Sequence, residues 1–142
     1  MTTETNKAIV RRYFEEIIDG RGDALEELFL PDCTIHRLEL PEPIRGLEQF
    51  QIFLQMARFS IQQTRTTIHR LVAEGDHVAA HLSHKTIFGG PVGTPLGMKD
   101  ATGQAVEWSA MTLFRCEQGK IAEEWVYRDE MGTLRQLGLL PT

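Results

Sequence analysis

The sequence predicts an α+β domain in which N-terminal helices pack on a mainly antiparallel sheet from the second half of the chain. Apolar residues recur at helical spacing as far as Ala57. From Thr64 onward, β-branched residues and turn signals indicate successive strands. The chain has 142 residues and is 42% hydrophobic, which matches a single domain over residues 1–142 with a substantial core.

Two helices are expected in the first thirty residues. The first begins after Thr5 as N-cap and stops before Gly20. Asp23 is then expected to cap a shorter helix, which ends near Leu30 because Pro31 disfavours helical geometry in the residue before it. The apolar face of the first helix comprises Ile9, Val10, Tyr13, Phe14, Ile17 and Ile18, and that of the second Leu25, Leu28 and Phe29.

A short strand at 33–36 and a third helix follow, the helix carrying Leu47, Phe50, Phe53, Leu54 and Ala57 on one face. Four longer strands are then expected to form an antiparallel meander, at 64–73, 77–88, 105–116 and 120–127. The segment 89–103 is rich in Gly and Pro and too long for a tight hairpin turn. We expect it to cover a cavity or an oligomer edge.

Long strands twist, so this sheet is expected to curve strongly into a cone-shaped barrel, closed on one side by helices, with a ligand pocket at the mouth. The strands carry apolar residues of both parities, such as Ala80 and Leu82 against Ala79 and Ile87. One face covers the helices and the other needs a partner. We therefore expect a two-fold homodimer through the open face of the sheet.

Charge and composition exclude several classes of partner. The net charge is −5 and the basic residues are scattered, which argues against nucleic acid or an anionic membrane. No apolar run approaches the roughly 20 residues that span a bilayer, and the N-terminus lacks the apolar core of a secretion signal, so a cytoplasmic location is expected. Cys33 and Cys116 have no metal-like or redox spacing and are expected to be partly buried free thiols, with a disulfide as the alternative. A small hydrophobic molecule is the expected partner.

Asp129 is the first candidate for catalysis. It follows the aromatic strand residues Trp125 and Tyr127, shares their strand parity, and precedes a short helix, so all three are expected to line one wall of an apolar cavity. Aromatic walls that exclude water would make a carboxylate basic enough to remove a proton next to a carbonyl. The alternative is that Asp129 caps the final helix by accepting backbone N–H groups near Met131 and Gly132.

His84 and Tyr127 are the candidates for stabilising an enolate oxygen. His84 has the parity of the apolar residues of its strand, so it is expected to face the cavity, where it would polarise a carbonyl or relay a proton. The alternative is a histidine that is satisfied by hydrogen bonds or exposed at a strand end. His77 and His81 share a face but lie roughly 13 Å apart at strand rise, so no metal site is expected.

The remaining candidates are expected to share the roles of core and pocket. A buried Tyr13 hydroxyl needs a partner, which a ligand oxygen would supply. His36 or Arg37 is placed to meet an anionic part of a ligand at the mouth, with a solvated rim position as the alternative. Glu123 and Glu124 are expected on a solvated face or against a sister subunit. The substrate-binding candidates are Tyr13, Phe14, His36, Phe50, Phe53, Leu54, Phe88, Met98, Trp108, Met111 and Trp125.

The end of the chain carries a family resemblance. The run EWVYRD at 124–129, followed by LRQLG at 134–138, resembles the SnoaL-like polyketide cyclases of the nuclear transport factor 2-like superfamily, which also includes ketosteroid isomerases. The order of elements extends the resemblance over nearly the whole chain. It implies a cone-shaped cavity, no metal or organic cofactor, and an intramolecular aldol condensation assisted by an aspartate at the position of Asp129. Where the family often has a histidine before the tryptophan, this chain has Glu124.

Two functions of different classes follow. The first is a cofactor-independent cyclase or isomerase acting on a small hydrophobic carbonyl compound, with Asp129 as acid/base; hydrolase or dehydratase chemistry on the same scaffold is its variant. The second is a non-catalytic module that binds a small hydrophobic molecule. They differ in whether a second polar group converges with Asp129 in the cavity to stabilise a developing oxyanion.

Overall fold

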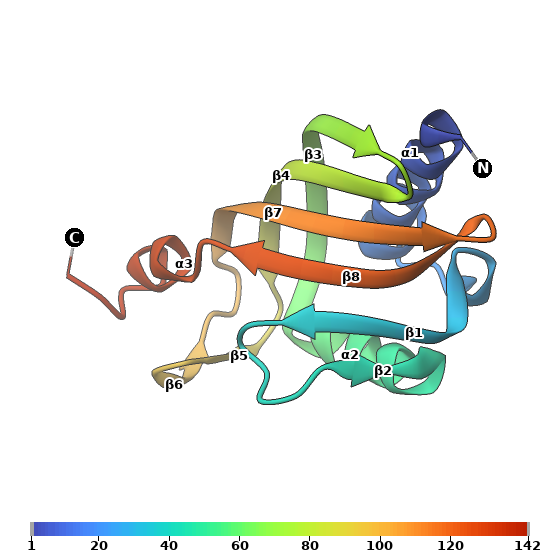
Figure 1. Ribbon diagram of the computed structural model, residues 1–142. Coiled ribbons are helices and arrows are strands. Elements are labelled where there is room, and N and C mark those ends of the chain that lie inside the picture. The colour runs from blue at the N-terminus through green and yellow to red at the C-terminus, as the bar shows by residue number, and fades with distance from the viewer. Residues whose placement is uncertain (1, 142) are drawn as a thin grey trace.

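Helices and short loops cover one face of a six-stranded sheet with the strand order β2-β1-β8-β7-β4-β3, as Figure 1 shows for the computed structural model, which describes residues 2–141. Helix α1 contacts β3 and β4, and α2 contacts β1. The elements are α1 (Thr3–Arg12), η1 (Tyr13–Asp19), η2 (Leu25–Glu27), β1 (Phe29–Arg37), β2 (Ile44–Arg45), α2 (Gly46–Ser60), β3 (Ile61–Glu74), β4 (His77–Phe88), β5 (Pro91–Thr94), β6 (Gly97–Asp100), β7 (Ala105–Glu117), β8 (Lys120–Arg128) and α3 (Glu130–Gln136).

The first helix changes character along its length. Its N-cap is Thr2, whose hydroxyl accepts a hydrogen bond from the Thr5 backbone at 3.0 Å, so the predicted N-cap at Thr5 is wrong by three residues. From Tyr13 the helix continues as the π-helix η1, which stops at Gly20 as predicted. Tyr13 and Phe14 of this π-helix are buried, and it ends on Asp19.

The predicted second helix is reduced to one 3₁₀ turn, which Asp23 does not cap, and its last residues begin a strand. Only the 3₁₀ turn η2 forms, and the chain is already extended at Phe29, which pairs with Ile121 of β8. This pairing lengthens β1 to residues 29–37 and runs parallel to β8. Leu25, Leu28 and Phe29 are all buried in the core, although they do not lie together on one α-helix.

The expected meander forms. Strands β3, β4, β7 and β8 pair antiparallel in sequence order, and β4 has the predicted bounds. The connecting segment 89–103 contains a hairpin of its own, in which β5 and β6 pair with Thr94 opposite Gly97. Gly97 has φ +107°, a conformation that allows so short a turn in a long segment. A role in covering a cavity or an oligomer edge stays a prediction. Among residues 2–141, no helix has both the length and the apolar character to cross a membrane.

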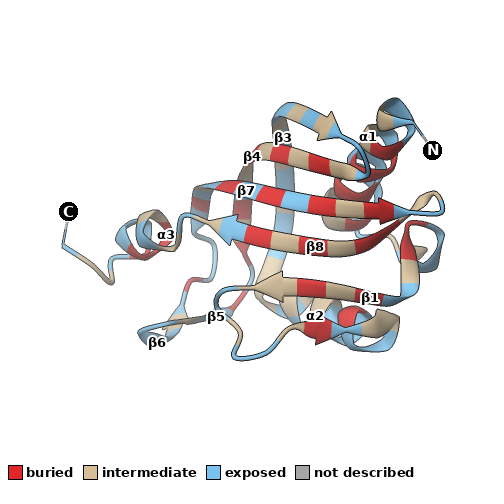
Figure 2. Cartoon of the chain, viewed as in Figure 1, coloured by how far each residue is buried: buried red, intermediate tan, exposed pale blue. Residues whose placement is uncertain are grey.

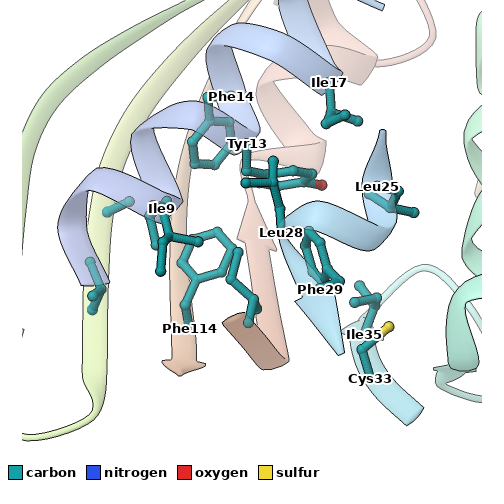
Figure 3. Packing of buried hydrophobic residues seen from close by; sticks show 14 of the residues in the cluster. Ile9, Tyr13, Phe14, Ile17, Leu25, Leu28, Phe29, Cys33, Ile35 and Phe114 are labelled. Carbon is teal, nitrogen blue, oxygen red and sulfur yellow. The ribbon is translucent and has the colours of Figure 1, made fainter. Parts of the chain in front are cut away.

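Burial alternates along the central strands, as the bands on β4, β7 and β8 in Figure 2 show. We call the side buried against the helices the inner face; it includes Val78, Ala80 and Leu82 of β4. The opposite side is the outer face. On the inner face Tyr13, Phe14, Phe29 and Phe114 come together (Figure 3), with Tyr13 ring centroids 5.0 to 6.0 Å from the other three.

Both cysteines are free and buried, so the disulfide alternative is wrong. Cys33 belongs to β1 and Cys116 to β7. Burial is the main reason that the pKa of each thiol is raised to about 11. Thiols of this kind stay protonated at neutral pH and behave as small core residues.

Candidate functional site

Asp129 caps the C-terminal helix and is exposed. Its Oδ1 accepts a hydrogen bond from the Gly132 backbone at 2.9 Å, which is the helix-cap geometry of the alternative interpretation. The expected position at the edge of a water-poor cavity is therefore wrong. Strand β8 ends at Arg128, so strand parity no longer governs the direction of Asp129. A catalytic role for Asp129 stays a prediction.

Trp125 and Tyr127 lie on the outer face instead of lining the cavity. The Tyr127 side chain is 51% exposed, and Trp125 stacks on His36 with ring centroids 5.2 Å apart. The residues of β8 buried on the inner face are Glu124 and Val126. Strand parity correctly predicts that Trp125 and Tyr127 share a face of the sheet. That face is the one turned away from the helices.

Three other predicted pocket residues also lie elsewhere. His36 accompanies Trp125 and lies 2.6 Å from the Glu123 carboxylate. Met111 pairs with Tyr127 across β7 and β8 and is 51% exposed. Met98, in the β6 hairpin, is 73% exposed because that hairpin forms a separate two-stranded sheet.

The other predicted pocket residues point inward or pack beside the core. Phe88 is buried in a second small cluster with Val106 and Leu137, away from the main core. Phe53 and Leu54 pack at the margin of the main core. The fully buried candidates of the main core are Tyr13, Phe14 and Phe50, and the half-buried ones near the inner face are Trp108 and His84.

His84 lies on the inner face, as its parity predicts. It is the cross-strand partner of Trp108, with ring centroids 6.1 Å apart, and its ring is 6.0 Å from that of Phe14. Burial, followed by the positive charges of Arg128 and Arg37, lowers the pKa of His84 to about 4. The imidazole is therefore neutral at physiological pH.

A chain of hydrogen bonds holds His84 in place. Its Nδ1 lies 2.9 Å from the hydroxyl of Thr66 on β3. The backbone N–H and the hydroxyl of Thr66 both donate to the Asp19 carboxylate, each at 2.7 Å. Residues 19, 66 and 84 are distant in sequence, so no local sequence motif predicts this arrangement.

Trp108 offers a donor to the same part of the inner face. Its indole Nε1 is buried and has no hydrogen-bond partner among residues 2–141. The guanidinium of Arg128 lies 4.3 Å from the Trp108 ring centroid, and Arg128 is also hydrogen-bonded to Glu130. Because buried donors in native proteins are nearly always satisfied, this indole N–H is available to donate to an oxygen atom from outside the chain.

Glu124 is a buried acid, although a solvated face or a subunit contact was predicted for it. Its side chain is 3% exposed instead of solvated. The Thr112 hydroxyl donates to Oε2 at 2.9 Å, while Oε1 has no partner in the described part of the chain. Burial raises the pKa of Glu124 to about 7, although the Thr112 hydroxyl and the charge of Arg37 act in the opposite direction. Its alternation with the buried residues Ala122 and Val126 was the available signal.

Glu124 and His84 belong to different parts of the inner face. His84 pairs with Trp108 of β7, whereas Glu124 pairs with Phe114 of the same strand. These two β7 positions are about 20 Å apart at strand rise. Glu124 acts on Tyr13 instead. The pKa of Tyr13 is raised by burial and by the negative charge of Glu124.

Neither of two cavities found among residues 2–141 is lined by Asp129, His84 or Glu124. The first, of about 70 Å³, lies between η1, α2 and β3 and is lined by Ile17, Ile18, Arg21, Leu54, Ala57, Arg58, Ile61 and Thr64. Thr64 of this lining lies two residues before Thr66 on β3. The volume of this cavity is well below the roughly 300–1,000 Å³ of typical ligand pockets. The second, of about 430 Å³, is lined by Thr3, Asn6, Gly75, Asp76, Cys116, Glu117 and Gln118.

Comparison with known proteins assigns the family. A family model described as SnoaL-like polyketide cyclase matches residues 7–137. The chain belongs to this family. A search of curated protein sequences finds no significant match. Among residues 2–141 of this SnoaL-like protein, no group of three or more His, Cys, Asp or Glu side chains is arranged to hold a metal ion.

Solved structures similar to this SnoaL-like protein identify its fold. TsrD from Streptomyces laurentii has a TM-score of 0.81 at 22% identity, covering 99% of each chain. A protein with a ketosteroid isomerase-like fold from Catenulispora acidiphila has a TM-score of 0.74 at 22% identity, covering 93% of each chain. An LEH-like epoxide hydrolase from M. tuberculosis has a TM-score of 0.74 at 17% identity, covering 95% of this chain and 90% of its own. The fold is nuclear transport factor 2-like and ketosteroid isomerase-like.

Proposed function

We propose that this protein catalyses cofactor-independent acid/base chemistry, an intramolecular aldol condensation or an isomerisation, on a small enolisable carbonyl compound bound at the inner face of the sheet. The observation that supports this is the cross-strand pair of His84 and Trp108. The pair presents a neutral imidazole beside an unpartnered buried N–H donor.

Each side chain of the pair has a role in enolate chemistry. Removal of a proton next to a carbonyl places negative charge on the carbonyl oxygen. The imidazole of His84 takes the proton, and the indole N–H of Trp108 donates a hydrogen bond to the oxygen as its charge develops. Arg128, whose guanidinium lies over the Trp108 ring, adds a positive charge beside the same oxygen.

The electrostatics favour one class of substrate. With its pKa lowered to about 4, His84 is a weak base. A weak base removes a proton efficiently only from an acidic carbon, because proton transfer depends on matching the two acidities. A carbon between two carbonyl groups is much more acidic than the carbon next to a single ketone. The proposed substrate is therefore a 1,3-dicarbonyl compound, as in a β-keto chain, which agrees with the family description.

The two tryptophans provide a matched test. Trp108→Phe keeps an aromatic ring on the inner face but removes the N–H donor, so kcat is expected to fall about 10²-fold. Trp125→Phe makes the same change on the outer face and should leave kcat near the parent value. Turnover is measured on a panel of 1,3-dicarbonyl, polyketide-like and cyclic ketone substrates, with epoxides included for hydrolase chemistry. Equal losses in both variants would contradict the assignment.

The second candidate is a non-catalytic module that binds a small hydrophobic molecule. The exposure of Asp129 and its role as a helix cap favour it, because they leave the family's expected acid/base group outside the interior. A ligand that binds only the folded state raises the melting temperature. A panel of compounds that raises Tm without any turnover would select this function over the enzyme.

We infer that a second copy of the chain covers the outer face. Met111 and Tyr127 pair across β7 and β8, and both are 51% exposed; Leu113 beside them is 37% exposed. Such an apolar group on a sheet face is typical of an interface. Light scattering is expected to give twice the mass of one chain, and Met111→Lys to give a monomer. Met98→Lys in the β6 hairpin is the control, and a monomeric parent protein would refute the inference.

A further inference from the structure

Asp19 connects the end of the π-helix to the proposed site. Its Oδ2 accepts the Thr66 backbone N–H and its Oδ1 accepts the Thr66 hydroxyl, both at 2.7 Å. Thr66 Oγ1 is in turn 2.9 Å from Nδ1 of His84. The three residues come from η1, β3 and β4, so the arrangement depends on how the helix packs on the sheet.

The hydrogen atoms of this chain can be assigned one by one. A carboxylate only accepts hydrogen bonds, so the single hydroxyl hydrogen of Thr66 points to Asp19. Thr66 Oγ1 then meets His84 as an acceptor, which requires a hydrogen on Nδ1 of the imidazole. Because His84 is neutral, its Nε2 has no hydrogen and presents a lone pair.

We propose that Asp19 is a positioning residue that, through Thr66, keeps the His84 proton on Nδ1 and leaves Nε2 as the hydrogen-bond acceptor toward the substrate. This inference rests on the proposed function and assigns which group of the site accepts a proton and which donates a hydrogen bond. His84 accepts a proton from the substrate in the first step, while the neighbouring Trp108 donates a hydrogen bond. An acceptor beside a donor fits the acidic C–H of a 1,3-dicarbonyl compound, or the O–H of its enol, next to a carbonyl oxygen.

Replacement of Asp19 by asparagine should reverse the donor and acceptor roles along the hydrogen bonds from residue 19 through Thr66 to His84. The asparagine oxygen can accept the Thr66 backbone N–H, and its NH₂ group can then donate to the Thr66 hydroxyl oxygen. The Thr66 hydrogen is released to point at His84, so Nδ1 becomes the acceptor and the proton moves to Nε2. The variant changes no volume and keeps every hydrogen bond, but it presents the wrong tautomer to the substrate. We expect kcat to fall about 10²- to 10⁴-fold, with KM changed little.

The direct test is ¹⁵N NMR of the imidazoles in the full chain at pH 7, with the His84 signals assigned by their loss in His84→Gln. The parent protein is expected to show a protonated Nδ1 and an unprotonated Nε2, and Asp19→Asn the reverse. Asp23→Asn, an exposed change in the following loop, should match the parent. Thr66→Val, which removes the hydroxyl, should give a mixture of tautomers.

The spectra separate this inference from the proposed function, because they need no substrate. A parent protein with the proton on Nε2, or an Asp19→Asn spectrum identical to the parent, would overturn the role of Asp19. If the tautomers behave as expected but His84→Gln retains full turnover, the role of Asp19 in setting the tautomer stands and the proposed function fails.

Discussion

His84→Gln is expected to lose most turnover while it still binds substrate. Glutamine can keep a hydrogen bond to Thr66, but its amide cannot take a proton, so kcat should fall about 10²- to 10⁴-fold with KM nearly unchanged. His81→Gln changes the same residue type on the outer side of the same strand and should behave like the parent. Steady-state kinetics on the 1,3-dicarbonyl panel, after circular dichroism has shown an unchanged fold, make the comparison.

The pH profile gives this prediction a second measurement. His84 accepts a proton only in its neutral form, and its pKa is lowered to about 4 by burial and by Arg128 and Arg37. The acid limb of kcat/KM, which reports the free enzyme, should therefore lie near pH 4 and not near the ordinary histidine value. In His84→Gln this limb should be absent from any residual activity.

Asp129→Asn is the competing variant. The family resemblance places the acid/base group at Asp129, so that hypothesis expects Asp129→Asn to lose turnover. Asparagine can still accept the Gly132 N–H, so the helix cap and the fold are expected to survive. Loss of turnover in Asp129→Asn together with full activity in His84→Gln would move the chemistry from the inner face to the start of α3.

The second large effect is on stability. Glu124→Gln is expected to stabilise the protein at pH 8 but not at pH 5. Burial raises the pKa of Glu124 from its ordinary value of 4.5 to about 7. Between these values the folded state holds a proton that the unfolded state has lost, so the parent loses stability as the pH rises through this window. Glutamine has nearly the same shape and cannot ionise, so the gain at pH 8 is on the order of 3 kcal/mol.

Urea denaturation of both proteins between pH 5 and 8 measures this difference. His84 has the opposite sign: its pKa is lowered to about 4, so the unfolded state binds a proton first and stability falls as the pH drops from 6.5 toward 4. This contribution is common to the parent and to Glu124→Gln and cancels in the difference. Glu123→Gln, the neighbouring change on the other face, should show no gain at pH 8. A Glu124→Gln effect that is the same at pH 5 and pH 8 would show that Glu124 does not titrate on folding.

Local patterns in the sequence predicted most elements of the fold. The alternation of apolar residues and the glycines at Gly75 and Gly119 predicted the central strands, including both ends of β4. The same alternation predicted that His84 faces inward with the apolar residues of its strand. These features depend on residues within a few positions of one another, which is the range over which helix and strand periodicity acts.

Packing between distant segments decided the candidate site. Parity groups Trp125 with Tyr127 and Glu124 with Val126, but only packing on the helices puts Glu124 inside and the aromatic pair outside. The parallel pairing with β8 turned Phe29 from a helical residue into a strand residue. The end of β8 at Arg128 made Asp129 a helix cap.

The sequence by itself thus determined the family, most of the helices and long strands, and which residues of a strand share a face. The tertiary structure alone decided which of those faces is buried and which distant side chains meet, above all Asp19, Thr66 and His84. The physical reason is that periodicity is set by the local backbone, whereas the burial of a charge and the direction of a hydrogen bond depend on neighbours that only the packed chain brings together.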